Sequence, residues 1–287
     1  MPVRYHYHAN PNGGLLYYTF PLLEAQPWLN HACSTRLGGV SRGIFSSMNL
    51  GLRTEDDPQH VRENFRLFAA AAGFSYDSLT LSQQSHTDTI RIIGQAERGN
   101  GLSRPSSYTD VDGLATALPG ITLVVNHADC QPLLFADPQK RVIGAVHAGW
   151  RGSAKGIAMR MVERLGREYG CKPADILVGI GAGIGACCYE VGPEVREAFL
   201  PWPANNAYLQ AKANGKYQLN LAEANRQILL AQGVRPEHIS VAGLCTACQN
   251  ELFFSHRFTK GRRGSLVSAI AIRENETGIK NRLGERR

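Results

Sequence analysis

The sequence of 287 residues has no apolar run that approaches the roughly 20 residues needed to cross a bilayer. Residues 1–6 (MPVRYH) lack the basic segment followed by an apolar segment that is typical of a signal peptide. The sequence also has no internal repeat, low-complexity tract or long Pro/Ser/Gly linker. We therefore expect a cytoplasmic protein without membrane contact, folded as a single domain over residues 1–287.

Complete disulfide pairing within the chain is excluded, because the number of cysteines, seven, is odd. In a reducing cytoplasm they are expected as thiols that fill the core, ligate metals or act as nucleophiles. Cys245 and Cys248 form a C-x-x-C pair, but the sequence contains no second pair of that spacing. Because a zinc site of this type needs two more ligands, we interpret the pair as structural.

Acidic residues are fewer than basic ones, 24 against 31, which leaves a formal net charge of +7. Part of the excess lies in the C-terminal tail, where Lys280, Arg282, Arg286 and Arg287 are interpreted as a solvated end. The sequence lacks a helix-long basic stripe and an aromatic RNA-binding signature, so nucleic acid is not the expected partner. A basic surface that attracts small molecules carrying phosphate explains the sign of the charge equally well.

Hydrophobic periodicity predicts short strands and helices in mixed order. Asp57 and Pro58 begin a helix, and Gly73 ends it. The apolar runs 121–126 and 142–147 are typical of buried strands. The regular alternation of a doubly wound sheet is missing, which favours an α+β or mixed α/β fold with mixed sheets flanked by helices. Further strands are predicted at residues 15–20, 31–35, 79–82, 89–93, 132–136, 176–180, 239–242 and 266–272, and further helices at 157–170 and 221–232.

Ligand-type side chains stand where two of these apolar runs end. Cys130 comes shortly after the run 121–126, and His147 ends the run 142–147. Loops at strand ends commonly hold ligands, and His86, from a separate loop, offers a second imidazole. Two imidazoles and one thiolate suit zinc and leave a fourth position for water. Spacing alone does not favour this site, because the trio matches no compact ligand motif and an isolated strand-end cysteine is usually structural.

Three segments carry a family resemblance: 84–86 (QSH), 128–132 (ADCQP) and 146–152 (VHAGWRG). Together they resemble the signature of the YfiH/laccase-domain family. Further segments agree in the expected order over about residues 30–273, namely 34–43 (STRLGGVSRG), 48–51 (MNLG), 181–191 ending in CCYEV, 245–246 (CT) and 253–257 (FFSHR). The family usually has Gln-Val-His at the first segment, and Thr-Ala-Asp-Cys where this chain has His127-Ala-Asp-Cys. Neither departure removes a presumed ligand.

The resemblance implies a mixed α+β fold similar to that of a bacterial toxin deamidase. It also implies a zinc-dependent purine nucleoside phosphorylase that acts on adenosine, inosine, guanosine and methylthioadenosine and deaminates adenosine. His86, Cys130 and His147 are the implied metal ligands and catalytic residues, and purine nucleosides and phosphate are the implied partners. Copper would compete for the same site in purified material, and a monomer is expected.

Five further residues are candidates for the chemistry. Deamination requires a proton carrier, and because the sequence has no His-x-Glu segment of the kind that zinc deaminases use, Asp129 and His127 are candidates by proximity. His127 is more simply interpreted as a core residue. Phosphorolysis requires cations around the phosphate, for which Arg36 and Arg151 are candidates, while Asn49 would orient the sugar or phosphate. Without the resemblance, surface salt bridges would be the preferred interpretation of both arginines.

Other functions remain open. With Cys130 as nucleophile and His147 as base, the chain would be a metal-independent thiol hydrolase with a low thiol pKa. The family's peptidoglycan editing factor implies hydrolysis of a cell-wall precursor instead. A laccase is disfavoured because one trio cannot supply several copper centres. A basic nucleic-acid-binding module is the non-enzymatic alternative. NAD is not expected, since residues 181–185 do not satisfy G-x-G-x-x-G and Pro193 should interrupt the helix that would follow.

Overall fold

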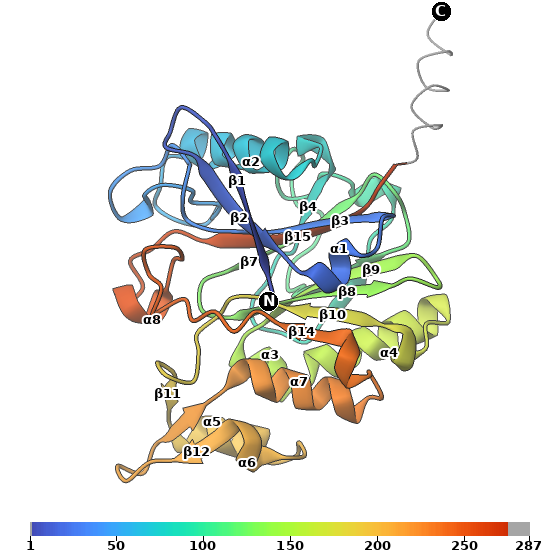
Figure 1. Ribbon diagram of the computed structural model, residues 1–287, viewed down its shortest axis with the longest axis vertical. Coiled ribbons are helices and arrows are strands. Elements are labelled where there is room, and N and C mark those ends of the chain that lie inside the picture. Colours follow the sequence, from blue (N-terminus) through green and yellow to red (C-terminus); the bar gives the residue numbers. More distant parts are fainter. Residues whose placement is uncertain (1, 275–287) are drawn as a thin grey trace, which may run out of the picture.

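The computed structural model describes residues 2–274, so the four basic tail residues named above lie outside the described part. Two six-stranded sheets form its centre (Figure 1). The first contains, in spatial order, β1 (Arg4–His8), β2 (Leu15–Thr19), β3 (Leu29–Ser34), β15 (Leu266–Ile272), β7 (Thr122–His127) and β4 (Leu79–Leu81). The second contains β14 (Ile239–Val241), β10 (Leu177–Ile180), β8 (Gln131–Asp137), β9 (Val142–Ala148), β6 (Gly113–Thr116) and β5 (Ile90–Ile92). Both sheets combine antiparallel and parallel pairs, which confirms the predicted mixed sheets.

The two sheets pack face to face, and helices cover their outer faces. Successive residues of β7 alternate between the layers, since Leu123 and Val125 lie in the core between the sheets while Val124 packs on the opposite face under α2 (Pro58–Ala72). The outer face of the second sheet packs against α4 (Ile157–Tyr169) and α7 (Leu221–Ala231). Figure 1 shows the resulting order of helix, sheet, sheet and helices. Central strands buried on both faces explain the continuous apolar runs.

The ends of α2 follow from local chemistry. The Asp57 carboxylate accepts a hydrogen bond from the backbone N–H of Gln59, and Pro58 occupies the first turn, where no amide hydrogen is needed. Gly73 ends the helix in the left-handed conformation with φ 71°. Both predicted ends of this helix are therefore confirmed.

A smaller layer packs against α7, on the side of that helix away from the second sheet, and shares an apolar cluster with it (Figure 1). It consists of a three-stranded sheet, in the order β11 (Glu190–Val191), β13 (Tyr217–Leu219) and β12 (Leu209–Ala211), together with α5 (Pro193–Phe199) and α6 (Asn205–Tyr208). Pro193 was expected to interrupt a helix, but it begins α5, because proline fits the first helical position. These strands are too short for a periodicity signal.

The sequence did not predict several further elements. They are β1, β6 and the short helices α1 (Pro21–Glu24), α3 (Trp150–Ala154) and α8 (His256–Thr259). No helix within the described residues is long and apolar enough to span a membrane. The assignment of residues 1–287 to a single domain stays a prediction.

Candidate metal centre and its cavity

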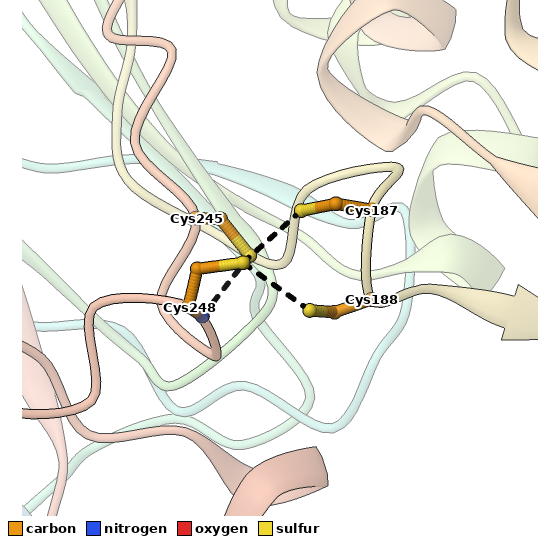
Figure 2. A group of neighbouring side chains, drawn as sticks. All are labelled: Cys187, Cys188, Cys245 and Cys248. Carbon is orange, nitrogen blue, oxygen red and sulfur yellow. Dashed lines mark hydrogen bonds between the residues drawn. The ribbon is translucent and has the colours of Figure 1, made fainter.

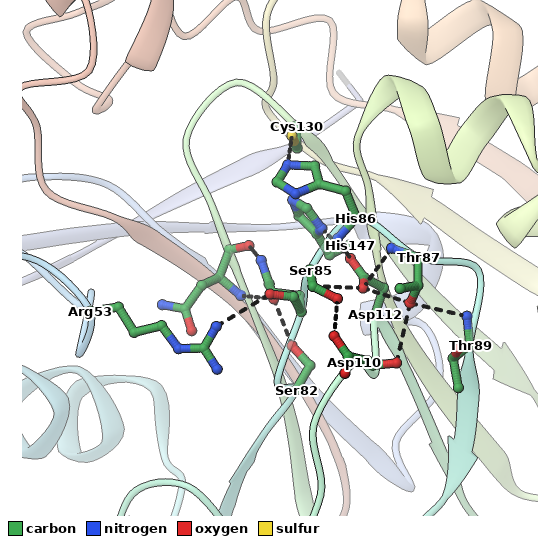
Figure 3. A network of polar contacts seen from close by, with 12 residues as sticks. Arg53, Ser82, Ser85, His86, Thr87, Thr89, Asp110, Asp112, Cys130 and His147 are labelled. Carbon is green, nitrogen blue, oxygen red and sulfur yellow. Dashed lines mark hydrogen bonds and ion pairs between the residues drawn. The ribbon is translucent and has the colours of Figure 1, made fainter. Parts of the chain in front are cut away.

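Two groups of ligand-type side chains lie close together in the part of the chain that the structure describes, and within each group the potential ligand atoms are all within 4.8 Å of one another. One group is Cys187, Cys188, Cys245 and Cys248 (Figure 2), and the other is His86, Cys130 and His147 (Figure 3). The C-x-x-C pair therefore has the partners that the sequence search missed, because they are adjacent cysteines rather than a second C-x-x-C pair. The trio of two histidines and one cysteine lines a cavity.

Cys130 lies where the chain passes from one sheet to the other. Residues 128–130 connect β7 of the first sheet to β8 of the second, with Asp129 in a left-handed conformation at φ 87°. β8 and β9 are antiparallel neighbours, and Pro132 pairs with His147. Cys130 and His147 therefore reach the same end of adjacent strands, as the prediction required.

His86 reaches the pair from the loop between β4 and β5. Its Nε2 atom lies 3.8 Å from Sγ of Cys130, and its ring stands edge-on to that of His147 with the centroids 5.0 Å apart. A Cβ atom added to Gly149 would lie 2.8 Å from the His86 ring and 3.0 Å from Sγ of Cys130. Glycine at this position therefore leaves the room that lets the three side chains converge.

A buried carboxylate that was not predicted from the sequence holds the ring of His147 and the backbone of His86. Oδ1 of Asp112 accepts a hydrogen bond from Nδ1 of His147 at 2.8 Å, and Asp112 also accepts the backbone N–H groups of Ser85, His86 and Thr87 (Figure 3). With Nδ1 donating to the carboxylate, Nε2 is the atom of His147 that is left on the side of Cys130 and His86, and it can bind a metal ion that displaces its proton. A histidine held in this way by a carboxylate is the usual arrangement around a protein-bound metal.

The charges in this cluster favour ionised side chains. Burial alone would raise the pKa of Asp112, but the hydrogen bond and charge of His147 and the backbone donors lower it to about 2. Burial opposes ionisation of Cys130 as well, yet the charge and hydrogen bond of His147 lower its pKa to about 6. The pKa of His147 rises to about 9 against the effect of burial, because Cys130 and Asp112 are both negative. A thiolate is thus available at neutral pH, either as a ligand or as a nucleophile.

The trio lines a cavity of about 820 Å³, a size suited to a ligand such as a nucleoside. Tyr189 adds an aromatic wall. Five arginines also line the cavity, and no carboxylate of residues 2–274 forms an ion pair with any of them. They are Arg53, Arg62, Arg104, Arg257 and Arg263. Unpaired guanidinium groups around a cavity are suited to an anionic ligand.

The arginines expected from the sequence lie elsewhere. Arg36 does not line the cavity; its guanidinium donates to the carbonyls of Ser46 and Asn250 and stacks over the ring of Phe254. The exposed Arg151 stacks over the ring of Trp150 and also lies outside the lining. Neither residue lines the cavity, and nothing in a linear sequence shows in which direction an arginine extends from its turn or helix.

Asn49 is fully buried and does not line the cavity. Its Oδ1 atom accepts the backbone N–H groups of Gly51 and Ser265, and its Nδ2 atom donates to Oγ1 of Thr54. The residue therefore holds the segment 51–54, which does line the cavity and carries Arg53.

The two candidate proton carriers both reach the cavity. Asp129 is 8% exposed, and its two oxygens accept hydrogen bonds from Oγ1 of Thr246 and the backbone N–H of Arg257, each at 2.6 Å. His127 is buried, as its interpretation as a core residue required, and its Nε2 atom lies 3.1 Å from Oγ of Ser268. Burial and the charge of His147 lower the pKa of His127 to about 3, so its ring is neutral.

The cavity arginines had a partial signal in the sequence. Arg257 ends the segment 253–257 (FFSHR), which contributed to the family resemblance without an assigned role. In the structure its guanidinium lies 5.1 Å from the ring centroid of Tyr189. No sequence pattern marked Arg263 or Arg53 as a cavity residue, because each becomes part of the cavity only when β15, β7 and the loop after Asn49 are assembled.

The fold and the site define a class of mixed α+β proteins with a histidine–cysteine centre in an arginine-lined cavity. A crystal structure of the YfiH protein of Bacillus licheniformis superposes with a TM-score of 0.86 at 34% identity and covers 93% of this chain and 99% of that one. A family model described as multi-copper polyphenol oxidoreductase laccase matches residues 30–273. The chain belongs to this laccase-like family.

Two relatives show how its members are named. The purine nucleoside phosphorylase YlmD of Geobacillus stearothermophilus is 39% identical over 247 residues, covering 85% of this chain and 90% of the relative. The human purine nucleoside phosphorylase LACC1 is 35% identical over 251 residues, covering 85% of this chain and 56% of the relative. The family model is thus described by copper chemistry, whereas these relatives are named for nucleoside phosphorolysis.

Proposed function

We propose that the chain is a zinc-dependent purine nucleoside phosphorylase that accepts adenosine, inosine, guanosine and methylthioadenosine, and that it also deaminates adenosine. The observation that carries this proposal is that the trio lines one cavity of about 820 Å³ together with five arginines, none of which forms an ion pair with a carboxylate of residues 2–274. A nucleoside and a phosphate ion together need such a combination of volume and positive charge. The names of the relatives support the same reaction.

Zinc is the metal that best suits the trio. Two imidazoles and one thiolate are zinc ligands, and the hydrogen bond from His147 to Asp112 leaves Nε2 of that histidine for the metal. We propose His86, Cys130 and His147 as the ligands, with an open fourth position. A bound zinc ion supplies Lewis-acid chemistry and lowers the pKa of a coordinated water toward 7. Copper binds such ligands at least as strongly, so it is a contaminant to control for.

In phosphorolysis a phosphate oxygen forms a bond to C1′ of the ribose while the bond from C1′ to the base nitrogen breaks. The electron pair of that bond leaves with the purine, which takes up a proton. We propose that Arg53, Arg257 and Arg263 bind the phosphate and neutralise its charge next to the sugar. Tyr189 offers a ring against which the purine can stack.

In deamination a water oxygen bonds to C6 of adenine and ammonia leaves, so a proton must move from the water to the leaving nitrogen. Asp129 is the proposed carrier, because it lines the cavity directly beside Cys130. Each of its oxygens accepts one hydrogen bond in the structure, and a carboxylate has further lone pairs for a proton.

The test uses metal-depleted protein reloaded with zinc and supplied with inosine and phosphate. The proposal expects hypoxanthine and ribose 1-phosphate in equal amounts from the reloaded wild type, and no product from the depleted protein or from His147→Ala. Full activity of the metal-depleted protein would contradict the proposal.

A second candidate function is a metal-independent thiol hydrolase. The observation that favours it is the pairing of Cys130, whose pKa is about 6, with His147, whose pKa is about 9. This function predicts that iodoacetamide abolishes activity while chelators leave it unchanged. Zinc dependence of the inosine reaction would exclude it for that substrate.

A further inference from the structure

The four cysteines come from two loops that follow the C-terminal ends of two neighbouring strands of the second sheet. β10 and β14 are parallel neighbours, so the loops that follow them emerge side by side. One loop carries Cys187 and Cys188 and the other carries Cys245 and Cys248 (Figure 2). A backbone bridge between Gly183 and Cys245 continues the pairing of the two strands into these loops. The proximity of the thiols is therefore imposed by the sheet.

The sulfur atoms gather around a single point. Sγ of Cys248 lies 3.3 Å from Sγ of Cys187 and 3.4 Å from Sγ of Cys188, and all four sulfurs are within 4.8 Å of one another (Figure 2). Four thiolates at about 2.3 Å from one zinc ion in a tetrahedron lie about 3.8 Å apart. The two shortest separations are about half an ångström below this value and none exceeds 4.8 Å, so one ion of this size fits among the four sulfurs after small side-chain adjustments.

The backbone around the sulfurs is arranged for a thiolate. Sγ of Cys245 accepts hydrogen bonds from the backbone N–H groups of Gly185, at 3.2 Å, and Cys248, at 3.5 Å. Such donors stabilise the negative sulfur that a metal requires. A Cβ atom at Gly185 would lie 3.0 Å from Cβ of Cys245 and 3.2 Å from Sγ of Cys187. The glycine thus permits the approach of the two loops.

We propose that Cys187, Cys188, Cys245 and Cys248 bind one zinc ion, forming a second metal site with four thiolate ligands. Four protein ligands leave no open position for water or substrate, so this site is structural. It shares no ligand with the trio of His86, Cys130 and His147, and it does not depend on the function proposed for that trio.

The site also braces the cavity. Thr246, between the two cysteines of the C-x-x-C pair, is fully buried, and its hydroxyl donates to Oδ1 of Asp129 at 2.6 Å. Tyr189, which follows Cys188 directly, lines the cavity. A zinc ion that links the two loops therefore holds in place Tyr189 and, through Thr246, Asp129.

The experiment counts zinc per chain by mass spectrometry of the purified, full-length protein. We expect two zinc ions in the wild type, one in Cys187→Ser/Cys188→Ser, one in His86→Ala/His147→Ala, and two in the matched control Cys171→Ser. A single zinc in the wild type that disappears in His86→Ala/His147→Ala would overturn the proposal. So would a disulfide between two of these four cysteines, located by peptide mapping of protein that is alkylated before digestion.

A second measurement leaves all four cysteines intact, so it does not depend on how a cysteine variant folds. His86→Ala/His147→Ala is loaded with cobalt in place of zinc and its absorption spectrum is recorded. The proposal expects the strong sulfur-to-cobalt charge-transfer bands and tetrahedral ligand-field bands of a four-thiolate site. Absence of these bands, or iron in place of zinc in the purified protein, would overturn the assignment.

Discussion

Nδ1 of His147 lies 2.8 Å from Oδ1 of Asp112, and the same carboxylate accepts the backbone N–H of His86. One buried side chain therefore orients two of the three members of the candidate metal centre, one from a strand and one from a loop. Asp112 is not one of the proposed metal ligands, so it acts on the geometry and basicity of the residues that are.

We predict that Asp112→Asn weakens zinc binding at the trio by roughly 10- to 100-fold, because the amide replaces the carboxylate that holds the His147 ring. Competition with a chromophoric chelator measures this affinity. Asp110→Asn is the matched control, since Asp110 accepts a hydrogen bond from Oγ of Ser85 and does not contact His147. Equal affinities of the two variants would show that Asp112 has no such role.

Gly149→Ala should disturb the trio for a steric reason alone. The backbone of Gly149 has a φ of −72°, which alanine can also adopt. The added Cβ atom, however, would lie 2.8 Å from the His86 ring and 3.0 Å from Sγ of Cys130. We expect lower zinc occupancy and at least a roughly tenfold loss of activity, since small displacements of catalytic groups are costly. Gly166→Ala in α4 is the control, because its new Cβ would meet its nearest neighbour at an ordinary 3.4 Å. Unchanged zinc content in Gly149→Ala would contradict the expectation.

The sequence pointed to the three side chains of the candidate centre, whereas it did not point to the arginines that line the cavity. His86, Cys130 and His147 lie in segments with a family resemblance, and the apolar runs before Cys130 and up to His147 correctly indicated strand ends. Arg36 was chosen for its place in the Arg-Leu-Gly-Gly turn and Arg151 for its place just after His147, yet their guanidinium groups stack on aromatic rings and do not line the cavity. The direction of a loop side chain depends on packing between distant segments, which local periodicity does not record.

The fold shows the same limit. Helix α2 was predicted to its ends, since Asp57, Pro58 and Gly73 act locally. The division of the strands between two sheets was not predictable, because β7 and β8 are consecutive in sequence but belong to different sheets. The convergence of Cys187 and Cys188 with the C-x-x-C pair likewise depends on the parallel pairing of β10 with β14.

The cavity arginines should determine the affinity for phosphate. We predict that Arg257→Gln raises the KM for phosphate by roughly 10- to 100-fold, as expected for the loss of one charge-assisted hydrogen bond of about 1.5–3 kcal/mol. The KM for inosine at saturating phosphate should change much less. Arg151→Gln, at an exposed position outside the cavity, is the matched control. An equal effect of both substitutions on phosphate would contradict the assigned binding site.

Stability should depend on pH through His31. Its Nε2 atom accepts the backbone N–H of Phe20 at 2.8 Å, and burial lowers its pKa to about 4 from 6.5. Between these two pKa values the unfolded chain binds the proton more readily than the folded chain. The contribution of neutral His31 to the free energy of unfolding is therefore fully present above pH 6.5 and is lost as the pH falls through about 4. It amounts to roughly 3 kcal/mol.

Urea denaturation at several pH values between 7 and 4 measures this contribution. The free energy of unfolding should fall less steeply with decreasing pH in His31→Gln than in the wild type. His8→Gln, on the exposed part of β1, is the control for the loss of a histidine. If His31→Gln keeps the full slope, the acid sensitivity arises elsewhere.

The most direct test of the proposed activity is the product formed from adenosine, with and without phosphate, by the wild type and Cys130→Ala side by side. We predict that the wild type forms inosine alone without phosphate, and adenine, hypoxanthine and ribose 1-phosphate when phosphate is present, while Cys130→Ala forms none of these products. If the wild type forms no purine product under any of these conditions, or if Cys130→Ala is equally active, the proposed role of the centre is wrong.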